Sequence, residues 1–303
     1  MGRLESGTSL QIPALTGKVI LVTGGTSGLG SEIVLQLSQH NPEHILFTGR
    51  NHDGANRLIQ TINSATQTRV TFIPCDFTSL TSVKKAGDAI ASAASRLDLV
   101  FCNAGVMAVP KGTTEDGYEI QFGINHLAHA LLIEVLLPTL LRTAESPGSD
   151  VRIVFTTSLG FTFATTIDFP HLRSEHDMGI LGALKRYGQS KLANILYARQ
   201  LAEHYPSIVS VSVHPGIVKT GMASRFSTFY RYFIKLATIG RQVSVTEGSK
   251  NQLWAATTGR ESIKNGQFYE PVGKVGRRTS ASRDDKLAAE LWAWTEEQLK
   301  GFM

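Results

Sequence analysis

The fold is decided by the stretch Val19-Ile20-Leu21-Val22-Thr23-Gly24-Gly25-Thr26-Ser27-Gly28-Leu29-Gly30. Its four leading apolar residues predict a buried strand, and the following residues, 31–37, predict a helix. A strand, a glycine-rich turn and a helix N-terminus together form an anion site, because backbone amides and the positive end of the helix dipole face a pyrophosphate. The stretch therefore predicts a nucleotide-binding unit, although a glycine-rich loop without a ligand would have the same pattern.

Three spaced glycines in this stretch have distinct expected roles. Gly24 would make the sharp turn, Gly28 would let the phosphates approach the backbone, and Gly30 would let the helix pack closely on the strand. The spacing of a P-loop is also present, but Ser31 and Glu32 stand where a P-loop needs Lys and then Ser or Thr. A dinucleotide site is therefore favoured over a P-loop.

Short apolar runs alternate with helix-like stretches along the chain. We expect strands near 18–23, 44–48, 69–74, 98–102, 150–157, 208–214 and 267–270. Helical patterns lie at about 28–40, 53–66, 79–95, 116–142, 180–205, 245–258 and 284–299. This alternation predicts an α/β fold, a Rossmann-type doubly wound parallel sheet of about seven strands with helices on both faces. Residues 1–303 are expected to form a single domain that begins with an N-terminal extension over residues 1–16.

A second chemical motif is the run Tyr187-Gly188-Gln189-Ser190-Lys191-Leu192-Ala193-Asn194. If the run is helical, Tyr187 and Lys191 lie one above the other on the same face. A lysine ammonium beside a phenol favours the phenolate, so a tyrosine whose pKa is ordinarily near ~10 can act as an acid or base around neutrality. The same spacing also suits an exposed amphipathic pair, so the meaning of the pair depends on the other motifs.

With these motifs the chain resembles the short-chain dehydrogenase/reductase family, over about residues 17–220. The turn at 23–30 is similar to that family's Thr-Gly-x-x-x-Gly-x-Gly fingerprint. Further segments match family motifs in the expected order, namely Cys102-Asn103-Ala104-Gly105 (with Cys102 in place of an Asn), Phe122-Gly123-Ile124-Asn125-His126, Ser158 after the run 151–157, and His214-Pro215-Gly216-Ile217-Val218-Lys219-Thr220. The run 187–194 and the long segment before it look most like the retinol-dehydrogenase-like branch.

The resemblance implies a catalytic set and a cofactor site. Tyr187 would donate a proton to the alkoxide that forms when a nicotinamide hydride reaches a carbonyl carbon, and Ser158 would hydrogen-bond the carbonyl oxygen. Lys191 would lower the pKa of Tyr187 and bind the nicotinamide ribose, while Asn125 would hold a water that links Lys191 to solvent. The implied cofactor contacts are Gly24, Thr26, Ser27, Gly28, Leu29, Gly30, Arg50, Asn51, Asp76, Phe77, Asn103, Ala104, Gly105, Tyr187, Lys191, Pro215, Gly216, Val218 and Thr220.

The cofactor is expected to be NADP(H). NAD-preferring sheets usually place an Asp or Glu at the end of the second strand, whereas this chain has Phe47-Thr48-Gly49-Arg50-Asn51 there. Arg50 can pair with a 2′-phosphate as a planar, permanently charged fork, although it could also be an ordinary surface arginine. Asp76, which is followed by Phe77, resembles the family's adenine-contacting Asp.

Two segments are expected to border the active site, because ligands sit beyond the carboxyl ends of parallel strands. One is the stretch between Ser158 and Tyr187. The other, at about residues 221–245, is predicted to be a substrate lid, with core packing of a small helix as the other interpretation. It contains the aromatic cluster Phe226, Phe229, Tyr230, Tyr232 and Phe233. An aromatic lid would favour a hydrophobic small-molecule carbonyl or alcohol as substrate.

Composition limits the other classes of function. The chain is 42% hydrophobic and 18% charged, as is ordinary for a globular protein, and its net charge of +5 is dispersed, which argues against a nucleic-acid partner. Cys75 and Cys102 each end an apolar run and are expected to be buried thiols. Because His126 and His129 lack a third ligand nearby in the sequence, no metal site is expected.

Membrane and secretory signals are not expected either. No window approaches the ~18 consecutive apolar residues of a membrane span, and residues 1–16 lack the pattern of a secretory signal. We therefore expect no transmembrane span, a cytoplasmic location, and a monomer or homodimer.

The sequence thus favours an NADP(H)-dependent oxidoreductase that interconverts a carbonyl and an alcohol on a hydrophobic small molecule, acting as a ketone or aldehyde reductase. The alternative from another class is a catalytically idle nucleotide-binding scaffold that acts through a protein partner, and the four intact catalytic positions argue against it. A serine hydrolase built on Ser158 is disfavoured, because no Gly-x-Ser-x-Gly elbow surrounds that residue.

Overall fold

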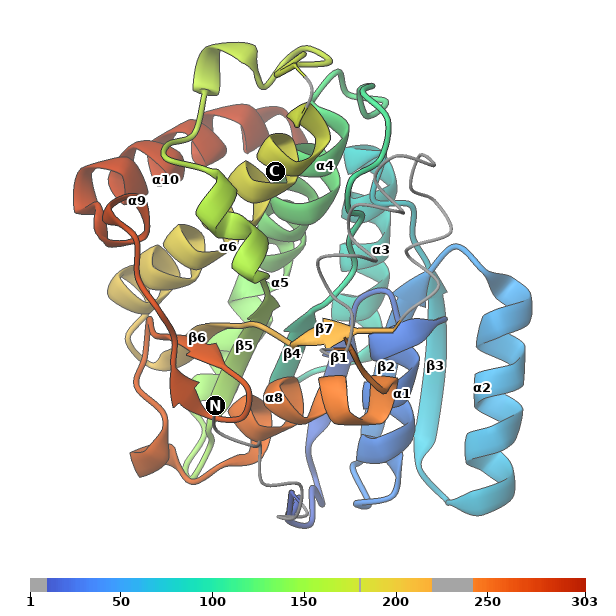
Figure 1. Cartoon of the computed structure of the whole chain (residues 1–303). Coiled ribbons are helices and arrows are strands. Elements are labelled where there is room, and N and C mark those ends of the chain that lie inside the picture. The colour runs from blue at the N-terminus through green and yellow to red at the C-terminus, as the bar shows by residue number, and fades with distance from the viewer. Residues whose placement is uncertain (1–9, 180, 220–241) are drawn as a thin grey trace.

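The computed structural model describes residues 10–179, 181–219 and 242–303, which form one α/β domain around a central sheet (Figure 1). This sheet has eight strands in the order β10-β9-β6-β5-β4-β1-β2-β3. Its strands are β1 (Val19–Val22), β2 (His44–Gly49), β3 (Arg69–Pro74), β4 (Leu99–Cys102), β5 (Val151–Thr156), β6 (Ile208–Val213), β9 (Phe268–Glu270) and β10 (Lys274–Val275). The strand order reverses between β1 and β4, which is the switch point at which Rossmann-type sheets bind dinucleotides.

The predicted doubly wound sheet is confirmed, with one strand more than expected. The seven expected strands pair in parallel. The eighth, β10, pairs antiparallel with β9 at the edge of the sheet. Sequence patterning missed it because it has two residues and both are exposed, so no apolar run or alternation marks it.

Two hydrophobic cores cover the two faces of the sheet. On β1, Val19 and Leu21 point into one core while Ile20 and Val22 point into the other, as the two-residue period of a strand requires. The first core is completed by α3 (Leu80–Ala93), α5 (Ala128–Ala144) and α6 (Gly182–His204). The second is completed by α1 (Gly28–Ser38), α2 (His52–Ala65) and α8 (Val245–Thr257). A strand buried on both faces explains the unbroken apolar run at 19–22.

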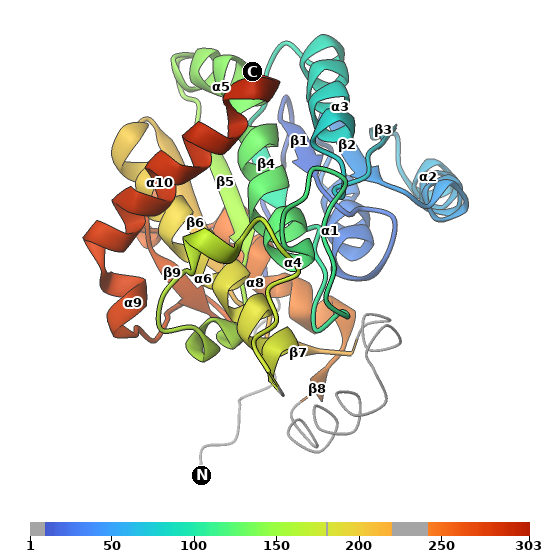
Figure 2. The same ribbon diagram turned by 90° about the horizontal axis from the view of Figure 1, so that it is seen from above.

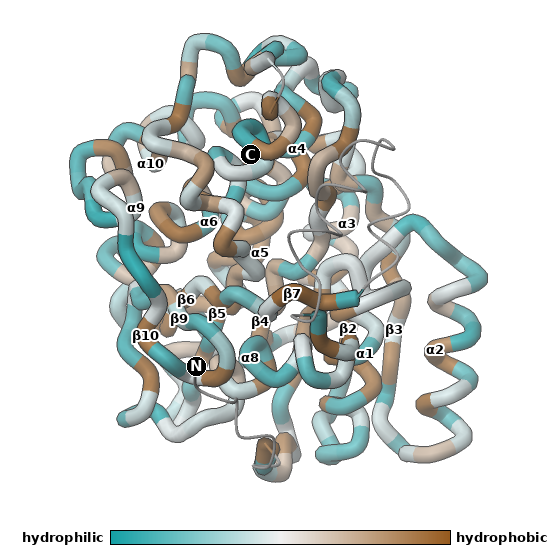
Figure 3. The backbone as a smooth tube through the Cα atoms, viewed as in Figure 1, coloured by the Kyte–Doolittle hydropathy of each residue, from teal (hydrophilic) through white to brown (hydrophobic). Residues whose placement is uncertain are grey.

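The helices α2 and α10 each bury their apolar residues against the rest of the domain. Along α2 the residues alternate between hydrophilic and hydrophobic (Figure 3), and Ala55 and Ile62 are buried against the sheet while Arg57 is exposed. The expected C-terminal helix is α10 (Asp285–Leu299), which lies beside α6 (Figure 2). There the Trp292 and Tyr197 rings stack with centroids 5.2 Å apart.

The helix expected at 116–142 begins later than predicted and changes its winding. It starts as α4 (Ile120–Phe122), widens into the π-helical turn η1 (Gly123–Leu127) and continues as α5. The residues before it form a tight turn, in which Gly117 has a φ of 81° and Thr114 N donates to Tyr118 O. The Glu119 carboxylate then accepts from the first free amides of α4, which sets the helix start.

The expected lid at about 221–245 lies mostly outside the described residues. Its described end forms the short strand β8 (Gln242–Val243), which pairs with β7 (Ile217–Val218), and the first residue of α8. Sequence patterning missed both two-residue strands. The expected N-terminal extension is described from Leu10 onward, and Leu15 at its end is buried, with its amide donating to His40 O.

One helical stretch in the described part of the chain, Ile120–Ala144, is long and apolar enough to cross a membrane, with a mean hydropathy of 1.5. Of its most apolar window, 78% is buried inside the protein. Its apolar character is therefore explained by its place between the sheet and the neighbouring helices α3 and α6.

Candidate active site

The described site residues meet at the carboxyl-terminal edge of the sheet. The glycine-rich turn follows β1, and Asn103, Ser158 and Pro215 follow the ends of β4, β5 and β6 within two residues. Tyr187 belongs to α6, which packs against β5, β6 and the loop after β5. Parallel pairing brings these ends to one edge, so residues up to two hundred positions apart in the sequence share one site.

Ser158 and Tyr187 contact each other directly. Ser158 caps the 3₁₀ helix η2 (Leu159–Phe163), where its Oγ accepts a hydrogen bond of 3.1 Å from Gly160 N. The Ser158 side chain also lies close enough to the Tyr187 hydroxyl group to lower its pKa. A Cβ at position 160 would lie only 2.8 Å from Tyr187 Cε1. Gly160 is therefore a site residue that motif reasoning missed, and the only sequence signal was a glycine two positions after the serine.

Burial governs the protonation of the Tyr187 and Lys191 side chains. It raises the pKa of Tyr187 to about 12, and the Ser158 hydrogen bond offsets this only in part. Burial also lowers the pKa of Lys191 to about 7. Lys191 Nζ donates to Thr156 O at 3.0 Å and lies 5.7 Å from the centre of the Tyr187 ring.

In this structure burial sets the direction of the Tyr187 pKa shift, and the Ser158 side chain opposes it. Removal from water disfavours the charged form of each group, so Tyr187 tends toward the neutral phenol and Lys191 toward the neutral amine. A lysine with a pKa of about 7 is only partly charged at neutrality. Its attraction for a phenolate is therefore weaker than the sequence argument assumed.

Asn125 lies inside the π-helical turn η1, which sequence patterning did not anticipate. Its amide nitrogen donates to Val106 O and to Ser190 Oγ, each at 2.9 Å, and its Oδ1 accepts from Val106 N at 2.8 Å. A Cβ at Gly105 would lie 2.9 Å from Asn125 Oδ1 and 3.6 Å from Lys191 Nζ. Gly105 thus lets Asn125 and Lys191 border the same small space.

The turn after β1 has the geometry of a dinucleotide cradle. Gly24 and Gly28 have φ values of 66° and 57°, which favour glycine. A Cβ at Gly30 would lie 2.2 Å from Gly24 O, so only glycine lets α1 pack this closely on the turn. Ser27 stands at the N-cap of α1 without a side-chain capping bond. The first amides of α1 therefore remain available to an anion, and these residues fit a pyrophosphate.

Thr23 holds the β1 and β4 loops together, a role that motif reasoning did not assign. Its Oγ1 accepts from Asn103 N at 2.8 Å and from Ala104 N at 2.9 Å, and Asn103 Nδ2 donates to Thr23 O. His129 Nε2 lies 2.9 Å from the same Oγ1. The expected cofactor contacts Asn103 and Ala104 are therefore positioned by a buried threonine.

At the adenosine end, Arg50 pairs with Asp76. The Arg50 Nη1 lies 3.4 Å from Asp76 Oδ2, and both side chains are more than a third exposed. Burial alone would raise the pKa of Asp76, but hydrogen bonds from Thr78 and the nearby Arg50 guanidinium bring it below its usual value. Asn51 accepts from Gly54 N and caps α2. The Asn51 side chain is thus already used as a helix cap, whereas that of Arg50 makes only the exposed pair with Asp76.

Three of the remaining expected contacts, Leu29, Val218 and Phe77, are packed against other side chains or helices. Leu29 and Val218 both lie against Gly248 of α8, where a Cβ would meet Val218 at 2.4 Å and Leu29 at 3.1 Å. Gly248 is a further residue that no motif indicated. The Phe77 side chain is buried against the His129 ring, with centroids 4.8 Å apart.

Three further expected contacts have distinct positions. A Cβ at Gly49 would lie 2.6 Å from Thr26 Cγ2, so Thr26 borders the end of β2. Gly216 has a φ of 86° in the turn between β6 and β7. Thr220 lies outside the described residues.

A cavity of about 580 Å³ lies on the other side of α6 from the catalytic residues. Lys185 and Gln189 line it together with residues 163–170 and Met178. Because these two residues are two positions from Tyr187 on either side, they point away from it on a helix of 3.6 residues per turn. None of the four expected catalytic residues lines this cavity.

The comparisons with known proteins agree with this arrangement. The family model described as short chain dehydrogenase matches residues 18–165. An uncharacterised oxidoreductase of Schizosaccharomyces pombe is 35% identical, over 94% of this chain and 86% of the relative. The short-chain dehydrogenase/reductase drtF of Aspergillus calidoustus is 34% identical, over 95% of this chain and 96% of the relative.

A solved structure has the same fold. NADPH-bound carbonyl reductase from chicken fatty liver matches with a TM-score of 0.65, at 24% identity, over 88% of this chain and 96% of that chain. Because relatives of this family are 34–35% identical over nearly the whole chain, and the family model matches residues 18–165, this chain belongs to the short-chain dehydrogenase/reductase family of oxidoreductases.

Proposed function

We propose that this oxidoreductase interconverts a carbonyl and an alcohol on a hydrophobic small molecule with NADP(H), and acts as a ketone or aldehyde reductase. One observation carries the proposal. Ser158 contacts Tyr187, and Lys191 lies on the same face of α6, all beside a glycine cradle that fits a pyrophosphate. A catalytically idle scaffold would have no need to keep this set together.

The bound nicotinamide would supply and accept the hydride. Tyr187 would transfer the proton, which its phenol carries at neutral pH, since burial raises its pKa to about 12. Ser158 would hydrogen-bond the substrate oxygen and stabilise the charge that develops on it. Lys191 would contact the ribose, and Asn125 would link Lys191 to solvent through a water.

The choice of NADP(H) rests on Arg50. The end of β2 offers no carboxylate for a ribose 2′-hydroxyl, and the Arg50 guanidinium is 52% exposed and held only at 3.4 Å by Asp76. It is therefore free to turn toward a 2′-phosphate. The chicken enzyme of the same fold is an NADPH complex, but the proposal depends on the arginine.

The preference for a hydrophobic substrate rests on the aromatic cluster of residues 226–233. This cluster follows the segment at 214–220 closely in the sequence and lies outside the described residues, so the preference is argued from the sequence alone. Placement in the retinol-dehydrogenase-like branch remains a prediction of the same kind, and so do the cytoplasmic location and the monomeric or homodimeric state.

The experiment is to follow NADPH oxidation across a panel of ketones, aldehydes and quinones, for the wild type and for Tyr187→Phe. The variant should lose turnover and still bind NADPH, because only the proton donor is removed. Tyr205→Phe, at the far end of α6 beside Trp292, is the matched control and should retain activity. Near wild-type turnover in Tyr187→Phe would refute the mechanism, and no turnover on any substrate by the wild type would favour the scaffold.

A further inference from the structure

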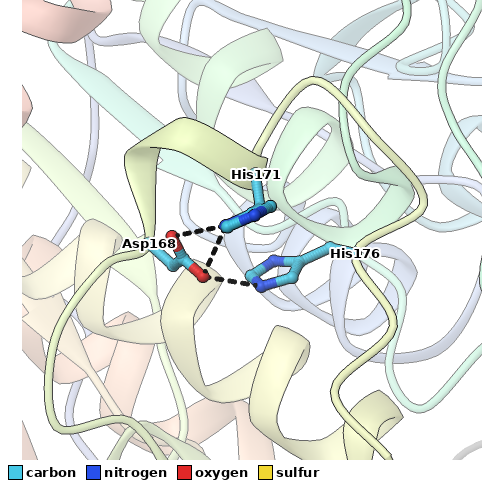
Figure 4. A group of neighbouring side chains, drawn as sticks. All are labelled: Asp168, His171 and His176. Atoms are coloured by element: carbon cyan, nitrogen blue, oxygen red, sulfur yellow. Dashed lines mark hydrogen bonds and ion pairs between the residues drawn. The ribbon is translucent and has the colours of Figure 1, made fainter.

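The stretch between Ser158 and Tyr187 contains a side-chain cluster that the proposed reaction does not use. Asp168, His171 and His176 point toward one another (Figure 4). Asp168 Oδ1 lies 2.9 Å from His171 Nδ1, and Asp168 Oδ2 lies 3.0 Å from His176 Nε2. One oxygen or nitrogen of each residue lies within 4.8 Å of those of the other two.

A short 3₁₀ helix brings the first two residues together. Asp168 precedes η3 (Phe169–His171), and His171 N donates to Asp168 O at 3.1 Å. In such a turn, residues three apart lie on the same side. The Asp168 amide donates to Gln189 Oε1 at 2.7 Å, which anchors the carboxylate to α6.

The third residue is held by its backbone and by burial. His176 has a φ of 49°, a left-handed conformation that is uncommon for residues other than glycine. Its amide donates to Ser174 Oγ and its carbonyl accepts from Arg186 Nη1. Its side chain is only 6% exposed, and within the described residues its Nδ1 has no hydrogen-bond partner. The His176 ring is therefore engaged through Nε2, the nitrogen that points at Asp168.

We propose that Asp168, His171 and His176 form a binding site for a divalent transition metal of the Zn²⁺ type. Two imidazole nitrogens and a carboxylate oxygen are ligands that Zn²⁺ accepts. Bonds of about 2.0–2.1 Å in a tetrahedron place ligand atoms roughly 3.3 Å apart. Asp168 Oδ2 already lies 3.0 Å from both His171 Nδ1 and His176 Nε2, and all the ligand atoms lie within 4.8 Å of one another, so small side-chain movements would bring them to these distances.

The exposure of the cluster leaves a path for the ion and room for water. The His171 side chain is 63% exposed and that of His176 is buried, so the site has one closed and one open side. Solvent can complete the coordination from the open side. The ion would then fasten the stretch that follows Ser158 into a closed loop against α6.

The test uses the full chain without a histidine tag, freed of metal by a chelator and titrated with Co²⁺. We expect saturable visible absorption at one Co²⁺ per chain, displaced by Zn²⁺. His171→Ala is the informative variant, because this exposed side chain can be removed without opening the core. Its Co²⁺ affinity should fall at least about 100-fold, since even the loss of an outer hydrogen-bond partner costs a metal site 10–100-fold.

The matched control is His52→Ala, an exposed histidine of α2 at the opposite side of the sheet, which should bind Co²⁺ as the wild type does. Zn²⁺ should also raise the Tm of the wild type and leave that of His171→Ala unchanged. The proposal would be overturned if Co²⁺ binding does not saturate, or if His171→Ala binds Co²⁺ as tightly as the wild type does. The cluster would then be a carboxylate that is hydrogen-bonded to two imidazoles.

Discussion

Tyr187 and Lys191 lie four residues apart on α6, and both side chains are buried. Burial moves the pKa of Tyr187 up to about 12 and that of Lys191 down to about 7, so each is driven toward its neutral form. For Tyr187 this means a bound proton at neutral pH, as carbonyl reduction requires.

Arg50 offers a prediction at the same scale. If it binds the 2′-phosphate, Arg50→Ala should weaken NADPH binding by ~1.5–3 kcal/mol, the value of a charge-assisted hydrogen bond. NADH affinity should barely change, because NADH has no 2′-phosphate. Dissociation constants for both cofactors, measured by fluorescence titration, check this.

The control for this prediction is Arg57→Ala, which removes an exposed arginine of the neighbouring α2. It should affect neither cofactor. An equal loss for NADPH and NADH in Arg50→Ala, or a preference of the wild type for NADH, would contradict the assigned role.

At the scale of elements, the contact between η2 and α6 sets the catalytic geometry. A Cβ at Gly188 would lie 2.8 Å from Gly160 O, and a Cβ at Gly160 would lie 2.8 Å from the Tyr187 ring. Two glycines thus allow a backbone-to-helix approach that brings Ser158 and Tyr187 together. Neither glycine has a φ in the left-handed region, so close packing, and not the turn conformation, requires them.

Gly160→Ala should therefore displace the Tyr187 ring and lower kcat by about 100-fold, as a shift near 1 Å in a reacting group can do. NADPH binding should change little, because the cradle at 24–30 is on another element. Steady-state kinetics with the best substrate of the panel measure the effect.

Gly112→Ala is a suitable comparison, since a Cβ there meets nothing within 4 Å and its backbone has no left-handed φ. It should leave kcat unchanged. If Gly160→Ala is as active as Gly112→Ala, then η2 does not position the tyrosine.

At the scale of the whole molecule, the burial of Lys191 makes the free energy of unfolding depend on pH. The pKa of Lys191 is about 7 in the folded protein and 10.5 in its ordinary state. Between these values the unfolded chain binds more protons, so stability rises with pH in this window and is lost as pH falls toward 7. The contribution is at most ~1.4 kcal/mol per pH unit.

Urea unfolding at two pH values tests this coupling. Between pH 7 and about 8.5, the wild type should gain roughly 1–2 kcal/mol relative to Lys191→Met, which has no charge to titrate. Lys84→Met, which removes a partly exposed lysine paired with Asp88, should follow the wild type. Parallel pH curves for the wild type and Lys191→Met would show that Lys191 is not neutralised on folding.

The sequence by itself determined the fold class and the family. Unbroken apolar runs such as 19–22 indicate strands covered on both faces, and local signals of this kind survive in any tertiary context. The motifs around Gly24, Ser158 and Tyr187 likewise depend on residue types at short spacing. The two-residue strands β7, β8 and β10 carry too few residues to show a pattern, and the π-helical turn at Asn125 has no sequence signature.

Only the tertiary structure decided how the site is packed and charged. Gly160, Gly248 and Thr23 matter because of atoms more than twenty residues away, and such contacts leave no local pattern in the sequence. The contact of Asp168 with His176, eight residues apart in an irregular loop, and the neutral states of Tyr187 and Lys191 were likewise decided by the tertiary structure. A pKa depends on how much water the whole fold excludes, and that is a property of the packed molecule and not of the spacing between two residues.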